Sequence, residues 1–401
     1  MRLLPFFLLM LVSSAFCQQT IQKMVDAAQK HDTIFVQEGV YQEYDITVTK
    51  PITIVGKGNV VIDAAEKGYV FKISTDSVAL KNITAKNVGR SYTKDFAAIY
   101  VSKSNDLTIE EVTLENVFFG LLIEKSKNIK IKNNRISSKA TTEAGAGNGV
   151  HLWHCSEAEI EGNEVHNLRD GIYFEFVKNS VVKNNHSHNN LRYGLHFMFS
   201  NNNEYFHNTF NNNGAGVAVM FSKFIKMTRN KFLKNWGTAS YGLLLKEIYD
   251  AEIVQNEFSE NTVAINLEGA TRINYTNNTF SNNGWALKVA GACYKNIFTN
   301  NNFLNNSFDV SYNSKLNDNS FKGNYWSSYT GYDLDKNGVG DVPYRPVKLF
   351  SYIVNQTPET IVLLRSLFVD IINFSEKVTP VFTPKNLVDE APLMQQYYDR
   401  N

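Results

Sequence analysis

A pattern of asparagine and aromatic residues recurs through the second half of the chain and limits the fold more than any other feature. Each copy reads asparagine, any residue, an aromatic residue, any two residues and a second asparagine. The copies begin at Asn208, Asn230, Asn256, Asn278, Asn301 and Asn319, and an earlier one at Asn184 has histidine in the aromatic position. Successive starts lie 24, 22, 26, 22, 23 and 18 residues apart. This period is too short for the common helical repeats and indicates one coil of a solenoid per copy.

Stacked coils of this kind would bring equivalent residues into contact. Asparagines at equivalent corners can join their amides into hydrogen-bonded ladders, and inward aromatic rings can form a dry column. Segments upstream, such as ITIVGKGNVVID and DLTIEEVTLENV, alternate apolar and polar residues in the same way. The sequence therefore predicts an all-β fold over residues 18–326, a right-handed parallel β-helix of the pectate-lyase-like type. Ile21, Met24 and Val25 have helical spacing and predict a helix that caps the first coil.

Six strands of the predicted helix can be aligned on a leading glycine. These glycines are Gly120, Gly149, Gly171, Gly194, Gly216 and Gly242. The second and fourth positions are apolar in every strand, so we expect them to point inward. The third positions are Leu122, His151, Tyr173, His196, Ala218 and Leu244, and the fifth are Glu124, Trp153, Glu175, Met198, Met220 and Lys246. These two columns are expected to form one outward face.

His196, Met198 and Met220 fall together on that face. Coils lie about 4.8 Å apart and alternate residues of a strand about 6.6 Å apart, so the three side chains are expected to form an exposed cluster. Imidazole and thioether together suit a soft ion, Cu(I) above all. Methionine also fills irregular gaps, so these residues could instead pack under a loop or a partner protein.

The stretch GVHLWHC supplies a second set of candidate soft ligands, His151, His154 and Cys155. His154 falls on an inward position of the alternation. A buried histidine with satisfied hydrogen bonds is therefore its expected role.

After the last repeat, residues 327–401 are expected to form a C-terminal extension that starts with an Asp-rich loop. The loop DLDKNGVGD contains Asp333, Asp335, Asn337 and Asp341 at positions one, three, five and nine. Glycine at position six fits a calcium loop, but Tyr344 stands where such a loop has glutamate. The pattern fits either a calcium site or a metal-free cluster of aspartate and asparagine turns.

A helix is predicted to follow, with Thr357 as N-cap and Pro358 in its first turn, and to end near Val378. Its apolar surface is wider than contact with one neighbour requires. We expect it either to pack on the last coils or to dock on a partner protein. The docking residues would be Ile361, Leu364, Phe368 and Ile371.

The N-terminus has the layout of a signal peptide, with Arg2, an apolar run over residues 3–12 and small residues after it. Cleavage is expected near Cys17, so that residues 1–17 are removed; a lipid-anchored Cys17 is the alternative. The formal net charge of +1 gives no electrostatic reason to expect nucleic acid as a partner. The two remaining cysteines, Cys155 and Cys293, do not make a disulfide framework.

The sequence resembles the NosD family. The resemblance is carried by YGLHFMFS, NNGAGVAVMFS, YGLLLKE, NNGWALKV, GNYWSSYTGYDLDKNGVGDVPYRPVKLF and LVDEAPLM. It implies a periplasmic, non-enzymatic protein that receives copper from a copper chaperone lipoprotein and passes it on for assembly of the copper site of nitrous oxide reductase. The ATPase and permease of an ABC transporter would be separate chains, and the permease would hold this protein at the membrane. Under this resemblance His196, Met198 and Met220 are expected to contact copper.

Two other functions remain open on the sequence alone. Many parallel β-helices act on acidic polysaccharides, and Glu124 and Glu175 lie in one column about 9.6 Å apart, a separation that suits an inverting carboxylate pair. A purely structural, carbohydrate-binding solenoid is the third interpretation, because a fold does not fix a function.

Overall fold

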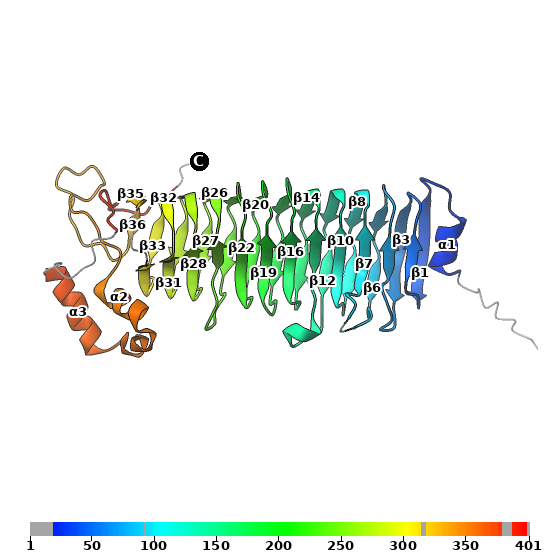
Figure 1. Ribbon diagram of the computed structural model, residues 1–401, viewed down its shortest axis with the longest axis horizontal. Coiled ribbons are helices and arrows are strands. Elements are labelled where there is room, and N and C mark those ends of the chain that lie inside the picture. The colour runs from blue at the N-terminus through cyan, green and yellow to red at the C-terminus, as the bar shows by residue number, and fades with distance from the viewer. Residues whose placement is uncertain (1–18, 92, 314–317, 379–386, 399–401) are drawn as a thin grey trace, which may run out of the picture.

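The repeat folds as the sequence predicts. The computed structural model describes residues 19–91, 93–313, 318–378 and 387–398. They form a right-handed parallel β-helix of about 13 turns with few helices. Figure 1 shows the coils stacked in one row. The predicted fold class is confirmed, whereas the predicted signal peptide, with Cys17, lies outside the described residues.

One side of the β-helix is a parallel sheet of 12 strands. Its strands are β2 (Ile46–Val48), β4 (Phe71–Ile73), β7 (Ala97–Ser102), β10 (Phe119–Glu124), β13 (Val150–Trp153), β16 (Asp170–Glu175), β19 (Tyr193–Met198), β22 (Ala215–Met220), β25 (Leu243–Lys246), β28 (Val263–Glu268), β31 (Trp285–Ala290) and β34 (Phe308–Asn313).

The other two sides belong to a sheet of 24 strands, which runs as two parallel ladders. Strands β1 (Thr33–Tyr41) and β3 (Thr53–Asp63) start it. The first ladder continues through β5 (Ala79–Lys81), β8 (Asn105–Glu110), β11 (Lys127–Lys132), β14 (Ser156–Glu161), β17 (Val181–Lys183), β20 (Glu204–Phe206), β23 (Lys226–Thr228), β26 (Tyr249–Val254), β29 (Thr271–Thr276), β32 (Tyr294–Thr299) and β35 (Asp318–Lys322). The second contains β6 (Thr84–Lys86), β9 (Thr113–Glu115), β12 (Arg135–Ser137), β15 (Glu164–His166), β18 (His186–His188), β21 (Thr209–Asn211), β24 (Lys231–Leu233), β27 (Glu257–Ser259), β30 (Thr279–Ser281), β33 (Asn302–Leu304) and β36 (Tyr325–Trp326).

Buried asparagines join the coils at one corner. Each side-chain amide donates to the side-chain oxygen of the equivalent asparagine in the next coil, at 2.9 to 3.1 Å. The members are Asn134, Asn163, Asn185, Asn208, Asn230, Asn256, Asn278, Asn301 and Asn324. Because each buried amide also donates to a backbone carbonyl, the ladder satisfies polar groups that the corner removes from water.

The ladder corrects the sequence pattern at both ends. Asn185 is the buried member, whereas Asn184, where the pattern was placed, is exposed with a φ of 55°. At the other end Asn324 continues the ladder, whereas Asn319 pairs with Asn296 in a separate short one. With these corrections the irregular spacings of 24 and 18 residues both become 23, since the starts are Asn185, Asn208, Asn301 and Asn324.

The inward aromatic residues stack as predicted. The rings of Phe210, Phe232, Phe258, Phe280, Phe303 and Trp326 follow one another with centroids 4.0 to 5.5 Å apart. All six side chains are buried. This column runs through the hydrophobic core beneath the second ladder of the 24-stranded sheet.

A helix covers the open first coil, as the sequence predicts. Helix α1 (Ile21–Ala27) buries Ile21 and Val25 against the core. Its first backbone N–H groups donate to Glu43, at 2.7 Å from Ile21 and 3.1 Å from Gln22. A capped end of this kind shields the apolar interior of a solenoid from water.

The far end is closed by a buried carboxylate and short helices. Asp389 accepts hydrogen bonds from the amide of Asn324 and from the indole N–H of Trp326, both at 3.0 Å, and so terminates the ladder. Three short helices lie between the last coil and Asp389 in the chain. They are α2 (Leu349–Gln356), the 3-10 helix η2 (Pro358–Leu363) and α3 (Leu367–Val378). A second 3-10 helix, η1 (Glu143–Gly145), lies in the loop before β13.

The predicted helix over 357–378 starts and ends where expected, but it is wrong as a single helix, because the segment divides into η2 and α3. Thr357 makes no side-chain cap, and the chain turns between η2 and α3. The break follows from packing. Leu364 at the turn and Val369 of α3 pack on one buried cluster with Phe350 and Val354 of α2 and apolar side chains from β28, β31 and β34, so the turn brings α3 onto that surface. None of the described helices is long and apolar enough to cross a membrane.

Candidate metal centre

The outer face of the 12-stranded sheet carries the two columns that the sequence predicts. His151 pairs with Tyr173, Tyr173 with His196 and His196 with Ala218 on successive parallel strands. In the neighbouring column Met198 pairs directly with Met220. The glycine alignment therefore gives the correct register, and strand alternation places His196 and Met198 on the same side of β19.

His196 is buried, so the expectation of an exposed histidine is wrong. Only 6% of its surface is accessible. The ring of Tyr173 in the preceding coil lies edge-on at 5.0 Å, and the ring of Tyr193 lies at 4.8 Å. The hydroxyl of Tyr241 donates to that of Tyr193 at 3.3 Å and adds to the aromatic cover. Bulky rings from adjacent coils thus close over an outward position.

The Nδ1 side of His196 faces a buried ion pair. Asp170 is fully buried, and its two carboxylate oxygens accept hydrogen bonds from Arg192 at 2.9 and 2.7 Å. His196 Nδ1 lies 3.2 Å from Arg192 Nη2 and 3.5 Å from Asp170 Oδ2. Burial by itself raises the pKa of Asp170, but the hydrogen bonds from His196 and Arg192 outweigh it and hold that pKa below its usual value. The carboxylate is therefore ionised at neutral pH.

The other ring nitrogen of His196 is left without a partner. Nε2 is buried and has no hydrogen-bond partner among the described residues. When Nδ1 donates its proton to Asp170, Nε2 carries a lone pair. A histidine held through one nitrogen by a carboxylate, with the other free, is the arrangement that metal-binding histidines commonly have.

Met198 and Met220 are half-buried neighbours at the ends of β19 and β22. Their strands are adjacent, so the two backbones lie about 4.8 Å apart. Ala218, which pairs with His196, has the smallest side chain of its column. The three predicted copper ligands therefore share one face of two neighbouring coils.

The secondary candidates do not converge on one point. His151 is half-buried between the rings of Phe119 and Tyr173, and burial lowers its pKa to about 4. Cys155 is an inward residue whose thiol donates to two backbone carbonyls at 3.4 Å, and burial raises its pKa to about 11. Both groups are thus neutral at pH 7.

His154 is exposed, so the expectation of a buried histidine is wrong. Its backbone turns the corner with a φ of 52°, where strand alternation no longer applies. The imidazole stacks at 4.5 Å on Phe176, which itself stacks on Phe199. With Cys155 it lines a cavity of about 270 Å³ along this corner.

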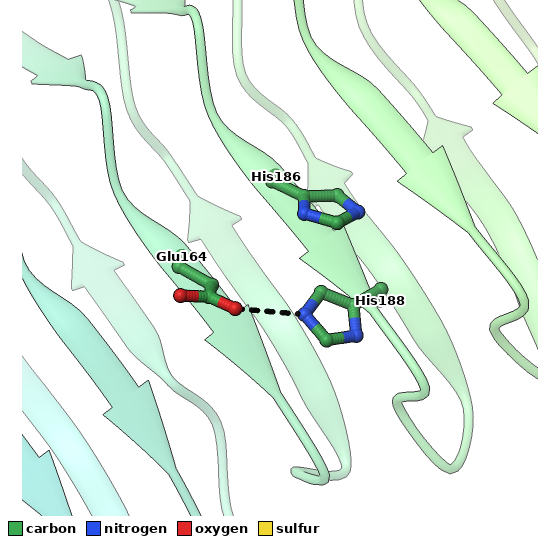
Figure 2. A group of neighbouring side chains, drawn as sticks. All are labelled: Glu164, His186 and His188. Carbon is green, nitrogen blue, oxygen red and sulfur yellow. Dashed lines mark hydrogen bonds and ion pairs between the residues drawn. The ribbon is translucent and has the colours of Figure 1, made fainter.

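A different cluster of metal-ligating residues lies on the 24-stranded sheet. Glu164 on β15 and His186 and His188 on β18 place one ligand atom each within 4.8 Å of one another. Figure 2 shows how the three side chains lie. The sequence analysis missed this cluster because it placed His186 in the inward aromatic position. The inward residue is Ser187, which pairs with Phe210 of the next coil. Histidines two residues apart on a strand share a face, and that spacing was the available signal.

The Asp-rich loop is held by hydrogen bonds within itself. Asp333 accepts from the backbone N–H groups of Asn337 at 3.1 Å and Gly338 at 2.8 Å, and Asp341 accepts from Leu334 at 2.7 Å. Asp335 accepts from the side-chain amide of Asn337 at 2.8 Å. These contacts are typical of the metal-free cluster of aspartate and asparagine turns, one of the two structures that the sequence allows. The calcium site, the other one, stays a prediction.

Three of the four predicted docking residues are exposed. Ile361, Phe368 and Ile371 have 46%, 54% and 55% of their surface accessible. Leu364 is half-buried and packs against the buried cluster beneath α2 and α3, and its role in docking stays a prediction. Other apolar side chains extend the exposed area: Val362, Leu363, Leu367 and Phe374.

Comparison with known proteins places these features in a family. The family model described as "Periplasmic copper-binding protein (NosD)" matches residues 137–331, which include both candidate metal clusters. Two proteins named "Probable ABC transporter binding protein NosD" are similar over most of their length. The relative from Pseudomonas aeruginosa is 24% identical, and the match covers 88% of this chain and 86% of the relative. The relative from Stutzerimonas stutzeri is 25% identical, and the match covers 89% of this chain and 85% of the relative. The chain thus carries a NosD-family domain over residues 137–331 and is similar to these NosD proteins over most of its length.

A second family model overlaps the NosD match. It describes a protein of unknown function (DUF1565) and matches residues 13–224, slightly more than half of the chain, so the chain belongs to this family. Its description names no activity. The copper-binding and transporter descriptions therefore come from the NosD relationship.

Solved structures similar to this chain share its fold. The mannuronan C-5 epimerase A-module of Azotobacter vinelandii has a TM-score of 0.66 and 14% identity, over 77% of this chain and 95% of that module. An alginate lyase of family PL6 has a TM-score of 0.55 and 12% identity, over 80% and 87%. At such identities the likeness describes the β-helix and says nothing about activity.

Proposed function

We propose that this protein is a periplasmic, non-enzymatic partner of an ABC transporter that receives copper from a chaperone lipoprotein and passes it on for assembly of the copper site of nitrous oxide reductase. The NosD family is described as periplasmic and copper-binding, and the curated relatives are named as transporter binding proteins. Copper in this account is cargo, so its site must both hold and release the ion.

The observation that carries the proposal is the shared face of His196, Met198 and Met220. Two thioethers on adjacent strands and an imidazole whose Nε2 has no hydrogen-bond partner among the described residues make a soft donor set. Thioether and imidazole ligands select Cu(I) over harder ions. Because Met198 and Met220 are half-buried and His196 is covered by tyrosine rings, the methionines would meet the ion first.

Asp170 and Arg192 position the imidazole in this proposal. The carboxylate orients Nδ1, and Arg192 keeps the carboxylate ionised through two hydrogen bonds. His151 and Cys155 are not needed as ligands, since the sheet holds them in separate surroundings. His154, on the exposed corner, is available for a contact with the donor or acceptor protein.

Cu(I) binding under reducing conditions tests this donor set. The mature protein is expected to take Cu(I) from a chromogenic chelator and to prefer it to Zn²⁺, because thioethers are poor zinc ligands. Met198→Leu/Met220→Leu keeps the side-chain volume, so the fold should survive while affinity for Cu(I) falls at least tenfold. Met227→Leu, on the buried face of β23, is the matched control. Equal affinity of the wild type and the double variant would contradict the proposal.

The exposed apolar surface of η2 and α3 is proposed as the contact with the permease. Seven exposed apolar side chains gather there, Ile361, Val362, Leu363, Leu367, Phe368, Ile371 and Phe374, and a contiguous exposed apolar patch commonly marks an interaction site. We propose that Phe368, Ile371 and Phe374 enter a groove of the permease, so that this protein is peripheral to the membrane.

Substitution on that surface tests the docking proposal without removing the tail. Deletion from Thr357 onward would also remove Asp389 and uncap the last coil. Phe368→Ser/Ile371→Ser changes exposed side chains and should leave the fold intact while abolishing co-purification with the permease. Leu334→Ser, at another exposed leucine, is the control. Retained co-purification of the double variant would contradict the assignment.

The relatives' names favour a binding protein over an enzyme, but the polysaccharide alternative has its own test. Glu124 and Glu175 flank Trp153 in one column, and each accepts a hydrogen bond from a tyrosine, at 3.1 and 3.4 Å. Incubation with alginate and with a neutral glucan should release no products. Product formation that Glu124→Gln removes would support the enzyme function instead.

A further inference from the structure

Glu164, His166, His186 and His188 form a two-by-two array on the outer side of the 24-stranded sheet. Strand β15 pairs with β18 in parallel, with Glu164 opposite His186 and His166 opposite His188. Between them Val165 and Ser187 point into the core and are fully buried. The strand register therefore fixes all four polar side chains on one face.

The array brings ligand atoms close together. His188 Nε2 lies 3.3 Å from Glu164 Oε1, and the rings of His186 and His188 stack with centroids 4.3 Å apart. Figure 2 shows Glu164 directed at His188, with His186 beside them. One ligand atom from each of the three lies within 4.8 Å of the others. A tetrahedral ion about 2.1 Å from its ligands would draw these atoms to about 3.4 Å, a small adjustment for the exposed ring of His186.

Neighbouring residues orient the array. Arg135 in the preceding coil bonds to Glu164 Oε2 at 2.7 and 2.8 Å, which leaves Oε1 turned toward the histidines. This hydrogen bond, more than any other influence, lowers the pKa of Glu164. The ring of His166 stacks on His188 at 4.9 Å from the other side. Burial lowers the pKa of both His166 and His188, so neutral imidazoles face an ionised carboxylate.

We propose that Glu164, His186 and His188 bind one divalent transition-metal ion of the zinc and copper(II) class. Two imidazoles and one carboxylate, with a fourth position open to water, are a common donor set for such ions. His166 supports the ring of His188 and is not itself a ligand. The ion replaces the hydrogen bond between His188 Nε2 and Glu164 Oε1, so the Nε2 proton moves to Nδ1. The amide nitrogen of Asn189, which donates to Nδ1 at 3.0 Å, must then turn away so that the amide oxygen can accept.

This site goes beyond the proposed function and does not depend on it. It has no thioether, so it should disfavour Cu(I) relative to the methionine cluster. It also lies on a different sheet, β15 and β18 rather than β19 and β22. A second ion of harder character could therefore bind while the methionine face is empty or loaded.

Titration of the metal-free mature protein with Zn²⁺, followed by Cu²⁺, tests the proposal. Competition with a chromogenic chelator should give one site, and Cu²⁺ should show nitrogen coupling in its electron paramagnetic resonance spectrum. His186→Asn, His188→Asn and Glu164→Gln should each weaken Zn²⁺ binding at least tenfold. His207→Asn removes an exposed histidine one coil away, at a φ of 55° that asparagine tolerates, and should leave affinity unchanged.

The outcomes separate this proposal from the copper proposal. Unchanged Zn²⁺ affinity in the three variants, or an equal loss in His207→Asn, would overturn it. His186→Asn changes an exposed side chain and carries the test if another variant fails to fold. Met198→Leu/Met220→Leu should keep Zn²⁺ binding while losing Cu(I), so that failure of one site leaves the other measurable.

Discussion

Replacement of Asn185 by alanine tests the corner ladder on which the whole β-helix depends. The side-chain oxygen of Asn185 accepts from the backbone N–H and the amide of Asn163, both at 2.9 Å. Its amide nitrogen donates to the carbonyls of Ile160 and Lys183 at 2.9 Å and to Asn208 at 3.0 Å. Alanine removes all five hydrogen bonds at a position that is only 2% exposed.

The loss of stability depends on which hydrogen-bond partners of Asn185 are left unsatisfied in the alanine variant. The amide of Asn163 still donates to Ile131, and the side-chain oxygen of Asn208 still accepts from the backbone of residue 185. The backbone N–H of Asn163 and the carbonyl of Ile160 lose their side-chain partner. A buried polar group left unsatisfied costs about 1–3 kcal/mol, so Asn185→Ala should lower the free energy of unfolding by about 2–6 kcal/mol.

The neighbouring residue supplies the control. Asn184 is exposed at a φ of 55°, and glycine adopts that backbone without steric cost, so Asn184→Gly should change stability by no more than about 0.5 kcal/mol. Hydrogen exchange followed by mass spectrometry gives the opening free energy coil by coil. Loss of protection should centre on the coils of Asn163, Asn185 and Asn208. Equal effects of the two substitutions would refute the register.

Two further predictions concern pH and the end of the ladder. Burial lowers the pKa of His151 from 6.5 to about 4, so the unfolded chain takes up the proton first. The contribution of neutral His151 to the free energy of unfolding is complete above pH 6.5 and is lost as the pH falls toward 4. In denaturant unfolding measured at several pH values, His151→Gln should reduce the dependence of that free energy on pH in this range. Asp389→Ala should remove the cap from Asn324 and Trp326 and raise hydrogen exchange in the last coils, with no change near α1. A uniform change along the β-helix would contradict this.

Local sequence patterns predicted the fold because each coil repeats the same few requirements. Buried asparagines, inward aromatics and leading glycines recur at one spacing, and the glycine alignment placed Met198 beside Met220 correctly. The pattern failed at Asn184 because this coil has Ser187 in the inward position where the later coils have an aromatic residue, and the adjacent His186 fits the pattern instead. Because the repeat was aligned one residue too early, His186 was assigned to an inward position, and the cluster that it forms with Glu164 and His188 was missed.

Other features depend on contacts between coils that one strand does not reveal. His196 is outward by alternation but buried, because Tyr173 and Tyr193 close over it. His154 is inward by alternation but exposed, because the chain turns a corner there with a positive φ. The break between η2 and α3 follows from packing of Val369 against the β-helix rather than from local helix propensity.

X-ray absorption spectroscopy of the Cu(I)-loaded protein tests the central claim most directly, because it reports which atoms surround the ion. The account predicts sulfur scatterers from Met198 and Met220 together with one imidazole nitrogen. It also predicts that the sulfur contribution disappears in Met198→Leu/Met220→Leu, whereas Glu164→Gln leaves it unchanged. A spectrum with nitrogen and oxygen neighbours only, identical in the wild type and the methionine variant, would contradict a copper site on this face.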